Sequence, residues 1–214
     1  LPSNVSMSIN KLWGSSSKDL YAVGNGGNIA HWDGVRWRKI ESPIGTGGTT
    51  LNINDIWGYY NQITGEWEIL AVASNILSSL EKEVLLIKNN QLKNLSKQGI
   101  KGTLSGVWFK SNRKYYVGGS GIYTKTFLSD NEWKGNPRDI SIYAKKAIRG
   151  NQINDIIVAG AFGELLHFNG YSWKSYINQT YLPAGTYLSV SMKENLVVVV
   201  GDNSREAIVT IGRR

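Results

Sequence analysis

A segment of apolar residues around a tryptophan recurs along the chain every 41 to 51 residues. Its clearest copies read INKLWG, INDIWG and LSGVWF, and two weaker copies read AKKAIRG and LSVSMK. A second apolar run follows each copy, as LYAVG, ILAVA, YYVGG, IIVAG and VVVVG. The equivalent positions are Trp13, Trp57, Trp108, Arg149 and Met192. A recurrence at this period indicates a chain built from repeated supersecondary units.

Each repeat reads as four short strands. The clearest copy, Ile9 to Trp37, consists of apolar runs separated by the turns SSSKD and NGGN and by Asp33-Gly34. Short runs joined by turns of this kind predict an antiparallel meander. We expect Asp33-Gly34 to close a two-residue hairpin. No stretch carries apolar residues at i, i+3, i+4 and i+7 over three turns, which excludes a helical solenoid.

These repeats predict an all-β fold, a β-propeller of five four-stranded antiparallel units. The runs are apolar nearly throughout because neighbouring units stack and bury both faces of each sheet. We expect a single domain over residues 1–214, and the fifth unit is incomplete because it stops after its third strand. The expected repeats are residues 9–41, 53–95, 104–143, 144–176 and 188–211.

The string LWGSSSKDLYAVGNGGNIAHWDGVRW resembles the repeat of kelch-like and WD40-like β-propellers in exported bacterial proteins. The segment from Asp155 to Trp173 matches the same pattern, and the other copies match at anchor points. The resemblance implies an extracellular, periplasmic or cell-surface location, although this chain carries no signal peptide. It implies a fold more than an activity, since propellers host many functions.

The phase of the repeats suggests that the propeller is larger than this chain. Leu1-Pro2 matches Leu182-Pro183, which follows a fourth strand and precedes the fifth copy. We therefore expect residues 1–8 to be a connector and the chain to be the C-terminal part of a longer propeller-bearing protein. The outer strand that the fifth copy lacks would then lie just before Leu1.

Composition removes several classes of function. The chain has no cysteine, so thiolate metal sites and disulfides are excluded. Its two histidines, His31 and His167, occupy equivalent positions three copies apart, where a shared metal site is not expected. Gly24 to Asn28 reads as a turn between strands and not as a nucleotide loop, because it opens no helix. We expect no metal and no cofactor, and no apolar run is long enough to span a membrane.

Positive charge is concentrated in one part of the sequence. The formal net charge is +8, and Lys82 to Arg149 holds 14 Lys/Arg against 4 Asp/Glu. Such a region either attracts an anionic partner or forms a solvated rim. No motif for nucleic-acid recognition accompanies it. The candidates for a polyanion-binding patch are Lys110, Arg113, Lys114, Lys145 and Lys146.

The second copy contains an insertion, YYNQITGEWE, that no other copy has. Its aromatic residues Tyr59, Tyr60 and Trp67 have no place in the repeat, so they are candidates for ligand stacking or for packing within the insertion. Asp55 and Lys11, on the expected innermost strands, are candidates for ligand binding in the central funnel.

The chain is expected to be a non-catalytic module that binds a protein or glycan ligand. The alternative is a carbohydrate-active module, either a lectin or a glycoside hydrolase that uses the central funnel. A glycoside hydrolase needs at least two acids near the scissile bond. The expected innermost strands carry only Asp55, so no catalytic residue is assigned and an enzyme is the less favoured reading.

Overall fold

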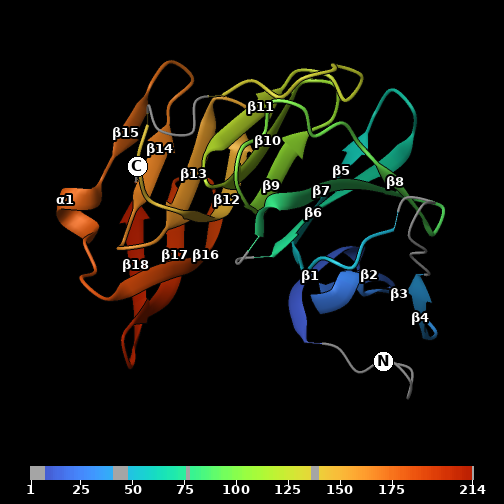
Figure 1. Cartoon of the computed structure of the whole chain (residues 1–214), viewed down its shortest axis with the longest axis horizontal. Coiled ribbons are helices and arrows are strands. Elements are labelled where there is room, and N and C mark those ends of the chain that lie inside the picture. The colour runs from blue at the N-terminus through green and yellow to red at the C-terminus, as the bar shows by residue number, and fades with distance from the viewer. Residues whose placement is uncertain (1–7, 41–47, 76–77, 136–139, 214) are drawn as a thin grey trace.

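The computed structural model describes residues 8–40, 48–75, 78–135 and 140–213. Their regular secondary structure is nearly all β and forms five antiparallel sheets, which we number blades 1 to 5 in chain order. In Figure 1 the blades follow one another in this order, from blade 1 in blue to blade 5 in red. The fold is a five-bladed β-propeller, as the repeats predicted.

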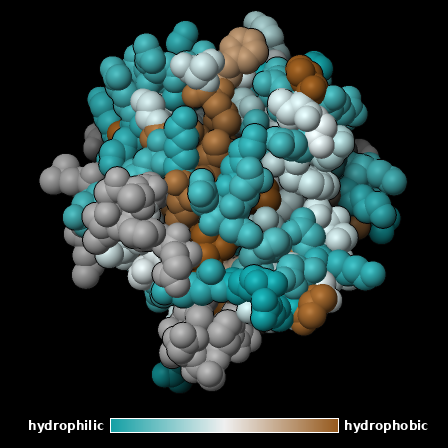
Figure 2. Space-filling model, turned by 90° about the vertical axis from the view of Figure 1, so that its right-hand side faces the viewer, coloured by the Kyte–Doolittle hydropathy of each residue, from teal (hydrophilic) through white to brown (hydrophobic). Residues whose placement is uncertain are grey.

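Blades 1 and 2 each have four strands. Blade 1 contains β1 (Ile9–Ser16), β2 (Asp19–Gly24), β3 (Ile29–Trp32) and β4 (Trp37–Ile40), with the 3-10 turn η1 (Asn25–Gly27) between β2 and β3. Blade 2 contains β5 (Ile53–Asn61), β6 (Glu66–Asn75), β7 (Ser78–Lys88) and β8 (Gln91–Asn94). Figure 2 shows the side of the molecule where β4 and β8 lie. Hydrophilic side chains cover most of it, and strongly hydrophobic residues are confined to a narrow strip and a few isolated positions.

Blades 3 to 5 complete the propeller. Blade 3 contains β9 (Leu104–Lys110), β10 (Lys114–Gly119) and β11 (Ile122–Lys125). Blade 4 contains β12 (Lys145–Gln152), β13 (Asp155–Gly160), β14 (Leu165–Phe168) and β15 (Trp173–Ser175) and is followed by the short helix α1 (Ile177–Thr180). Blade 5 contains β16 (Gly185–Lys193), β17 (Leu196–Asn203) and β18 (Glu206–Arg213).

The first strands of successive blades lie side by side, β1 with β5, β5 with β9, β9 with β12 and β12 with β16. Apolar side chains fill the space between each pair of blades, so that one cluster joins each blade to the next. Trp108, at 1% exposed, packs between blades 3 and 4. Each fully buried large apolar side chain contributes about 1.5–3 kcal/mol, so the inter-blade clusters stabilise the fold.

The fourth strand expected in the third repeat is reduced to one bridge. Thr124 on β11 pairs with Lys134 through both backbone hydrogen bonds, and the ladder continues no further in the described residues. Trp133 is buried, but its backbone N–H donates to Gln98 O. Its indole N–H donates to Ser96 O. The segment around Trp133 is therefore fixed by hydrogen bonds to the loop that precedes blade 3, and not by a fourth-strand ladder.

The tight hairpin expected at Asp33-Gly34 is instead a four-residue turn. Trp32 pairs with Trp37, and the Asp33 carboxylate accepts the backbone N–H groups of Val35 and Arg36 at 3.0 and 2.9 Å. A two-residue hairpin turn with positive φ at both positions is found at the equivalent place in blade 2, at Asn89 (φ 52°) and Asn90 (φ 57°). Asn tolerates this left-handed conformation better than most residues.

Blade 5 consists of three strands, as the incomplete fifth repeat predicted. β18 pairs with β17 over its whole length, from Asn203↔Glu206 to Leu196↔Arg213. Within the part of the chain that the structure describes, no strand pairs with the outer edge of β18. Of the connector expected at residues 1–8, residues 1–7 lie outside the described part of the chain.

Candidate binding site

A pocket lies where the turns between the first and second strands of blades 2, 3 and 4 come together. Its volume is about 270 Å³. It is lined by Tyr59, Tyr60, Asn61, Gln62 and Ile63 from blade 2, Lys110, Ser111, Asn112 and Arg113 from blade 3, and Gln152 and Ile153 from blade 4. The pocket therefore combines two of the aromatic candidates with two of the basic candidates, which lie far apart in the sequence.

The insertion of blade 2 forms one wall of this pocket. It extends β5 and β6 into a long hairpin in which Tyr60 pairs with Trp67 and Asn61 with Glu66. The Asn61 side chain accepts the N–H of Ile63 at 2.9 Å and so caps the turn. Gly65, at φ +70°, provides the left-handed residue that the turn needs. The insertion is thus a hairpin, with Thr64-Gly65 in its turn.

Two cations face this hairpin from blade 3. Lys110 Nζ lies 5.7 Å from the centre of the Tyr59 ring and donates to Gln152 Oε1 at 2.5 Å. Burial, and secondarily the charge of Arg113, lower the pKa of Lys110 below its ordinary value. Arg113 is exposed on the turn after β9. An anion in the pocket would relieve the repulsion between the two cations.

Hydrogen bonds of the two residues before Arg113, Ser111 and Asn112, fix the turn that carries it. Asn112 has φ +55°, its backbone N–H donates to the Tyr115 hydroxyl at 3.1 Å, and its amide donates to Asn61 Oδ1 at 3.1 Å. Ser111 donates to Glu68 Oε1 at 3.2 Å. Burial raises the pKa of Glu68 although three hydrogen bonds oppose the shift. These contacts fix the turn of blade 3 against the hairpin of blade 2.

Trp67, the third aromatic candidate, lies outside this pocket. Its ring meets Trp13 edge to face at 5.4 Å and Tyr60 at 5.6 Å, and 41% of the residue is exposed. It lines a second cavity of about 360 Å³ between blades 1 and 2, together with His31 and Tyr21. Part of the insertion therefore packs on itself and on Trp13, and part borders open cavities.

The remaining basic candidates do not join Lys110 and Arg113. Lys114 lines a separate cavity beside Lys125 and Lys134, and Lys146 is half-buried on β12. Lys145 is 2% exposed, and its Nζ donates to Ser141 O and Tyr143 O at 2.8 and 2.6 Å. Placing Lys145 in a polyanion-binding patch was therefore wrong, since burial and these two bonds remove it from the surface.

Asp55 and Lys11 lie on the innermost strands as expected, but Asp55 is 3% exposed and fully engaged. Its Oδ2 accepts the backbone N–H of Val107 at 2.9 Å. Lys11 Nζ lies 3.5 Å from Ser189 Oγ of blade 5. Burial, with a further effect of Arg149, lowers the pKa of Lys11. Asp55 is thus a structural residue of the core and offers no free oxygen to a ligand.

Arg149, which replaces the repeat tryptophan in blade 4, is the partner of Asp55. Its Nη1 and Nη2 donate to the two carboxylate oxygens at 2.8 and 2.9 Å, and its guanidinium lies 5.0 Å from the centre of the Trp57 ring. Burial opposes the charge on Arg149, but the charge and hydrogen bonds of Asp55 hold the pKa of the guanidinium above its ordinary value. The arginine in a tryptophan position was the available sequence signal for this pair.

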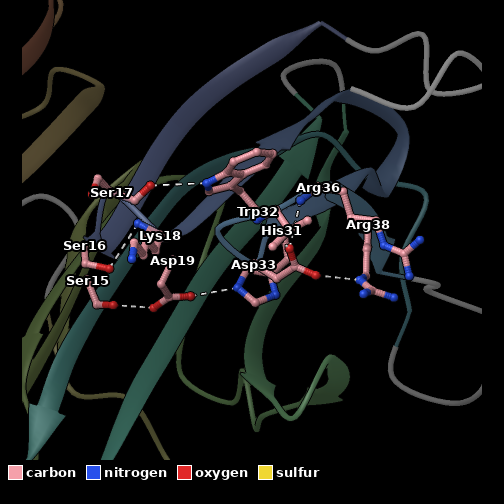
Figure 3. Close-up of polar contacts among 11 residues, drawn as sticks. Ser15, Ser16, Ser17, Lys18, Asp19, His31, Trp32, Asp33, Arg36 and Arg38 are labelled. Atoms are coloured by element: carbon pink, nitrogen blue, oxygen red, sulfur yellow. Dashed lines mark hydrogen bonds and ion pairs between the residues drawn. The ribbon is translucent and has the colours of Figure 1, made fainter.

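Both histidines pair with an aspartate of their own blade, a contact that the sequence analysis missed. His31 Nε2 lies 2.7 Å from Asp19 Oδ1, as Figure 3 shows, and His167 Nε2 lies 3.0 Å from Asp155 Oδ1. Ser15 donates to the other oxygen of Asp19, not to the histidine. The set therefore lacks the serine–histidine hydrogen bond of an activated serine nucleophile, and its contacts join β1, β2 and β3 of the blade.

Among the described residues, no group of three or more His, Cys, Asp or Glu side chains is placed to hold a metal ion. Neither of the helical segments in this part of the chain is long and apolar enough to cross a membrane.

The fold and the pocket define a β-propeller with a basic, aromatic-lined cavity at one end. No protein-family model matches the chain, and no curated protein matches its sequence. Solved structures do match it. The chain is similar to YCF48 bound to D1 peptide, with 14% identity, a TM-score of 0.68 and coverage of 100% of this chain and 66% of YCF48.

Two further similarities come from different functional classes. RRP9 WD40 repeats match with 12% identity and a TM-score of 0.65, over 98% of this chain and 64% of RRP9. The GH74 enzyme of Niastella koreensis matches with 11% identity and a TM-score of 0.69, over 96% of this chain and 36% of the enzyme. The chain thus spans about a third to two thirds of these proteins. At such identities the likeness shows the propeller fold alone, and the WD40-like, kelch-like and exported aspects stay predictions.

Proposed function

We propose that this propeller is a non-catalytic binding module that holds an acidic segment of a partner protein in the pocket between Tyr60, Lys110 and Arg113. The observation that supports this most is the convergence of two cations and two tyrosines on one cavity of about 270 Å³. Tyrosine and arginine are enriched where protein partners bind, because they combine a large contact area with directed hydrogen bonds.

The electrostatics of the pocket favour a carboxylate. Lys110 is partly withdrawn from water and lies near the positive Arg113, so both charges gain from a negative group between them. The Gln152 side chain and the exposed part of Tyr60 add polar contacts at the rim. A structural neighbour, YCF48, is solved with a bound peptide, which is consistent with a peptide-binding role for this fold.

A carbohydrate-active role has less support. On the innermost strands β1, β5, β9, β12 and β16, all of them described, the one carboxylate is Asp55, and Arg149 and Val107 occupy it. A lectin with one site per blade would need similar pockets in each repeat, whereas this pocket takes different residues from three blades.

We also propose that the protein lies outside the cell, in the periplasm or at the cell surface, as the resemblance of its repeats implies.

Binding of a fluorescein-labelled glutamate-rich peptide, followed by fluorescence anisotropy, tests the proposed function. We expect Arg113→Glu to weaken binding by about tenfold or more, because it places a negative charge in the pocket. Lys101→Glu is the matched control. It makes the same charge change at an exposed residue of the same basic region that does not line the pocket.

The two variants separate a pocket from a general field. If Lys101→Glu weakens binding as much as Arg113→Glu, the overall positive charge and not the pocket attracts the peptide. If the wild-type chain does not bind the acidic peptide at about 0.05 M salt, where charges are weakly screened, the proposal is wrong.

A further inference from the structure

The cavity of about 360 Å³ between blades 1 and 2 differs in charge from the pocket at Arg113. Two carboxylates line it, Asp19 from blade 1 and Glu66 from blade 2, against the single lysine Lys88. In a chain of formal net charge +8, this cavity therefore carries a net negative charge when His31 is neutral. Its volume lies at the lower end of the range of about 300–1,000 Å³ that is usual for ligand pockets.

The insertion hairpin of blade 2 separates this cavity from the pocket at Arg113. Tyr60 and Asn61 on β5 line the pocket. Trp67 and Glu66, which pair with them on β6, line the cavity. The two strands of the insertion thus contribute side chains to two different sites, and what the cavity binds does not depend on the function proposed for the pocket.

Hydrogen bonds within blade 1 fix the carboxylate of Asp19 at the cavity. Its Oδ1 lies 2.7 Å from His31 Nε2, and its Oδ2 accepts from the Ser15 hydroxyl, as Figure 3 shows. A carboxylate has about four acceptor positions, and 29% of the Asp19 side chain is exposed, so the group can accept further hydrogen bonds from a ligand. A fixed carboxylate of this kind favours a cationic donor over an anion.

The Tyr21 side chain lines the same cavity, although the residue is only 8% exposed. Its ring stacks on His31 with 4.2 Å between the ring centres, and its hydroxyl forms no hydrogen bond with another described residue. Burial, and secondarily the charge of Asp19, raise the pKa of Tyr21 to about 12. The hydroxyl is therefore neutral at pH 7, and it is a nearly buried polar group that a ligand can satisfy.

Aromatic and aliphatic side chains form the rest of the wall. Trp67 is fixed by edge-to-face contacts with Trp13 and Tyr60, and Ile69 and Ile87 line the cavity beside it. Aromatic rings attract cations, tryptophan most strongly. Methylene groups next to a charged end pack favourably on apolar side chains. The wall therefore suits a ligand with an alkyl chain that ends in a positive charge.

We propose that this cavity binds a primary alkylammonium group, the chemistry that a lysine side chain shares with small amines. An ammonium has three N–H donors and no acceptor, which matches a site with two carboxylates and the Tyr21 hydroxyl. Lys88 Nζ pairs with Glu66 at 2.7 Å, and both side chains are more than half exposed. Such an exposed pair contributes little to stability, so a ligand ammonium can replace Lys88 at Glu66.

NMR titration of the ¹⁵N-labelled full chain tests the proposal with four probes at constant ionic strength. They are n-butylammonium chloride, Nα-acetyl-lysine methylamide, Nα-acetyl-norleucine methylamide and methyl glucoside. We expect both amines to shift the amides of His31, Trp67 and Asn89, which line the cavity. The norleucine derivative keeps the alkyl chain but lacks the charge, so it should bind at least about tenfold more weakly than the lysine derivative. Tighter binding of the lysine derivative than of butylammonium identifies a polypeptide as the source, and equal binding identifies a free amine.

The equivalent histidine–aspartate pair of blade 4 provides a matched control. Asp19→Asn should weaken binding of the lysine derivative at least about tenfold. Asp155→Asn makes the same change beside His167, away from the cavity, and should leave the affinity within about twofold. Glu66→Gln changes an exposed residue that the fold does not need, so it keeps the test valid if Asp19→Asn does not fold, and it should weaken binding by about threefold.

Three results would overturn the proposal. The first is equal binding of the lysine and norleucine derivatives, which would show an apolar pocket without charge recognition. The second is binding of methyl glucoside alone, which would make the cavity a sugar site. The third is amine binding that Asp19→Asn and Glu66→Gln leave as strong as in Asp155→Asn.

Discussion

Arg149 on β12 and Asp55 on β5 form a bidentate ion pair that links blade 4 to blade 2 across blade 3. The Nη atoms lie 2.8 and 2.9 Å from the carboxylate oxygens, and both residues are less than 10% exposed. Val107 of blade 3 contacts both, since its N–H donates to Asp55 and its carbonyl accepts from Arg149. One pair thus fixes three blades relative to one another.

Removing one member of this pair should strongly destabilise the protein. We expect Arg149→Met and Asp55→Asn each to lower the free energy of unfolding by about 3–5 kcal/mol, because each leaves an uncompensated charge in the core. The double variant removes both charges, so its loss should be well below the sum of the two. Urea denaturation of all four proteins measures the coupling, and additive losses would show that the pair does not act as a unit.

The space around Gly58 and Gly212 predicts different effects of adding a methyl group at these two glycines. A Cβ at Gly58 would lie 2.3 Å from the Trp13 ring, whereas the nearest atom to a Cβ at Gly212 is 3.8 Å away. We expect Gly58→Ala to lower stability by about 1–3 kcal/mol through overpacking. Gly212→Ala should be neutral within about 0.5 kcal/mol. Thermal melts that rank the two variants the other way would contradict this packing.

The turn at Asn89-Asn90 should be sensitive to β-branched residues. Replacing both by valine forces two such residues into the left-handed region, at a cost of about 1–2 kcal/mol each. Gln62→Val, in an exposed turn where φ is not positive, serves as the control and should change stability little. Equal midpoints in denaturant for the two variants would argue against the assigned turn.

Glu164 should make stability fall as pH rises. It is 1% exposed, and burial raises the pKa of its carboxyl although Lys145 opposes the shift. A carboxyl with a raised pKa in the folded state favours folding at low pH, and that contribution is lost as pH rises from about 4.5 through the folded value. Glu164→Gln should therefore reduce the decline in unfolding free energy between pH 4.5 and 7. Glu81→Gln makes the same chemical change at an exposed residue and serves as the control, and equal pH profiles for the two variants would contradict the role of Glu164.

The propeller itself could be predicted because the information is local and repeated. Each copy carries its own apolar runs and turns, and Trp13 and Trp57 recur at a blade's period. The three-stranded fifth blade could be predicted in the same way, because the fifth repeat contains three apolar runs where the others contain four. Position in the repeat, however, does not report side-chain direction, which is why Lys145 was assigned to the surface while its backbone was assigned correctly to a first strand.

The sequence identified individual residues of the site but did not show that they line one pocket. Tyr59 and Tyr60 were identified because the insertion is private to one repeat, and Lys110 and Arg113 because charge is clustered. Their convergence depends on which turns meet at one end of the propeller, which is a property of blade stacking. Turn type at Asp33 was misjudged because a carboxylate that caps backbone N–H groups stabilises a longer turn than the dipeptide suggests.

Binding of an acidic peptide in the cavity between blades 2, 3 and 4 is tested most directly by two-dimensional NMR of the ¹⁵N-labelled chain, titrated with the glutamate-rich peptide, because the spectra report where the ligand lies. We expect the largest amide shifts at Tyr60, Ile63, Asn112 and Ile153, which line or border the cavity, and we expect them to be absent in Arg113→Glu. Shifts confined to the separate basic cavity around Lys114, Lys125 and Lys134, or spread evenly over the basic surface, would contradict it.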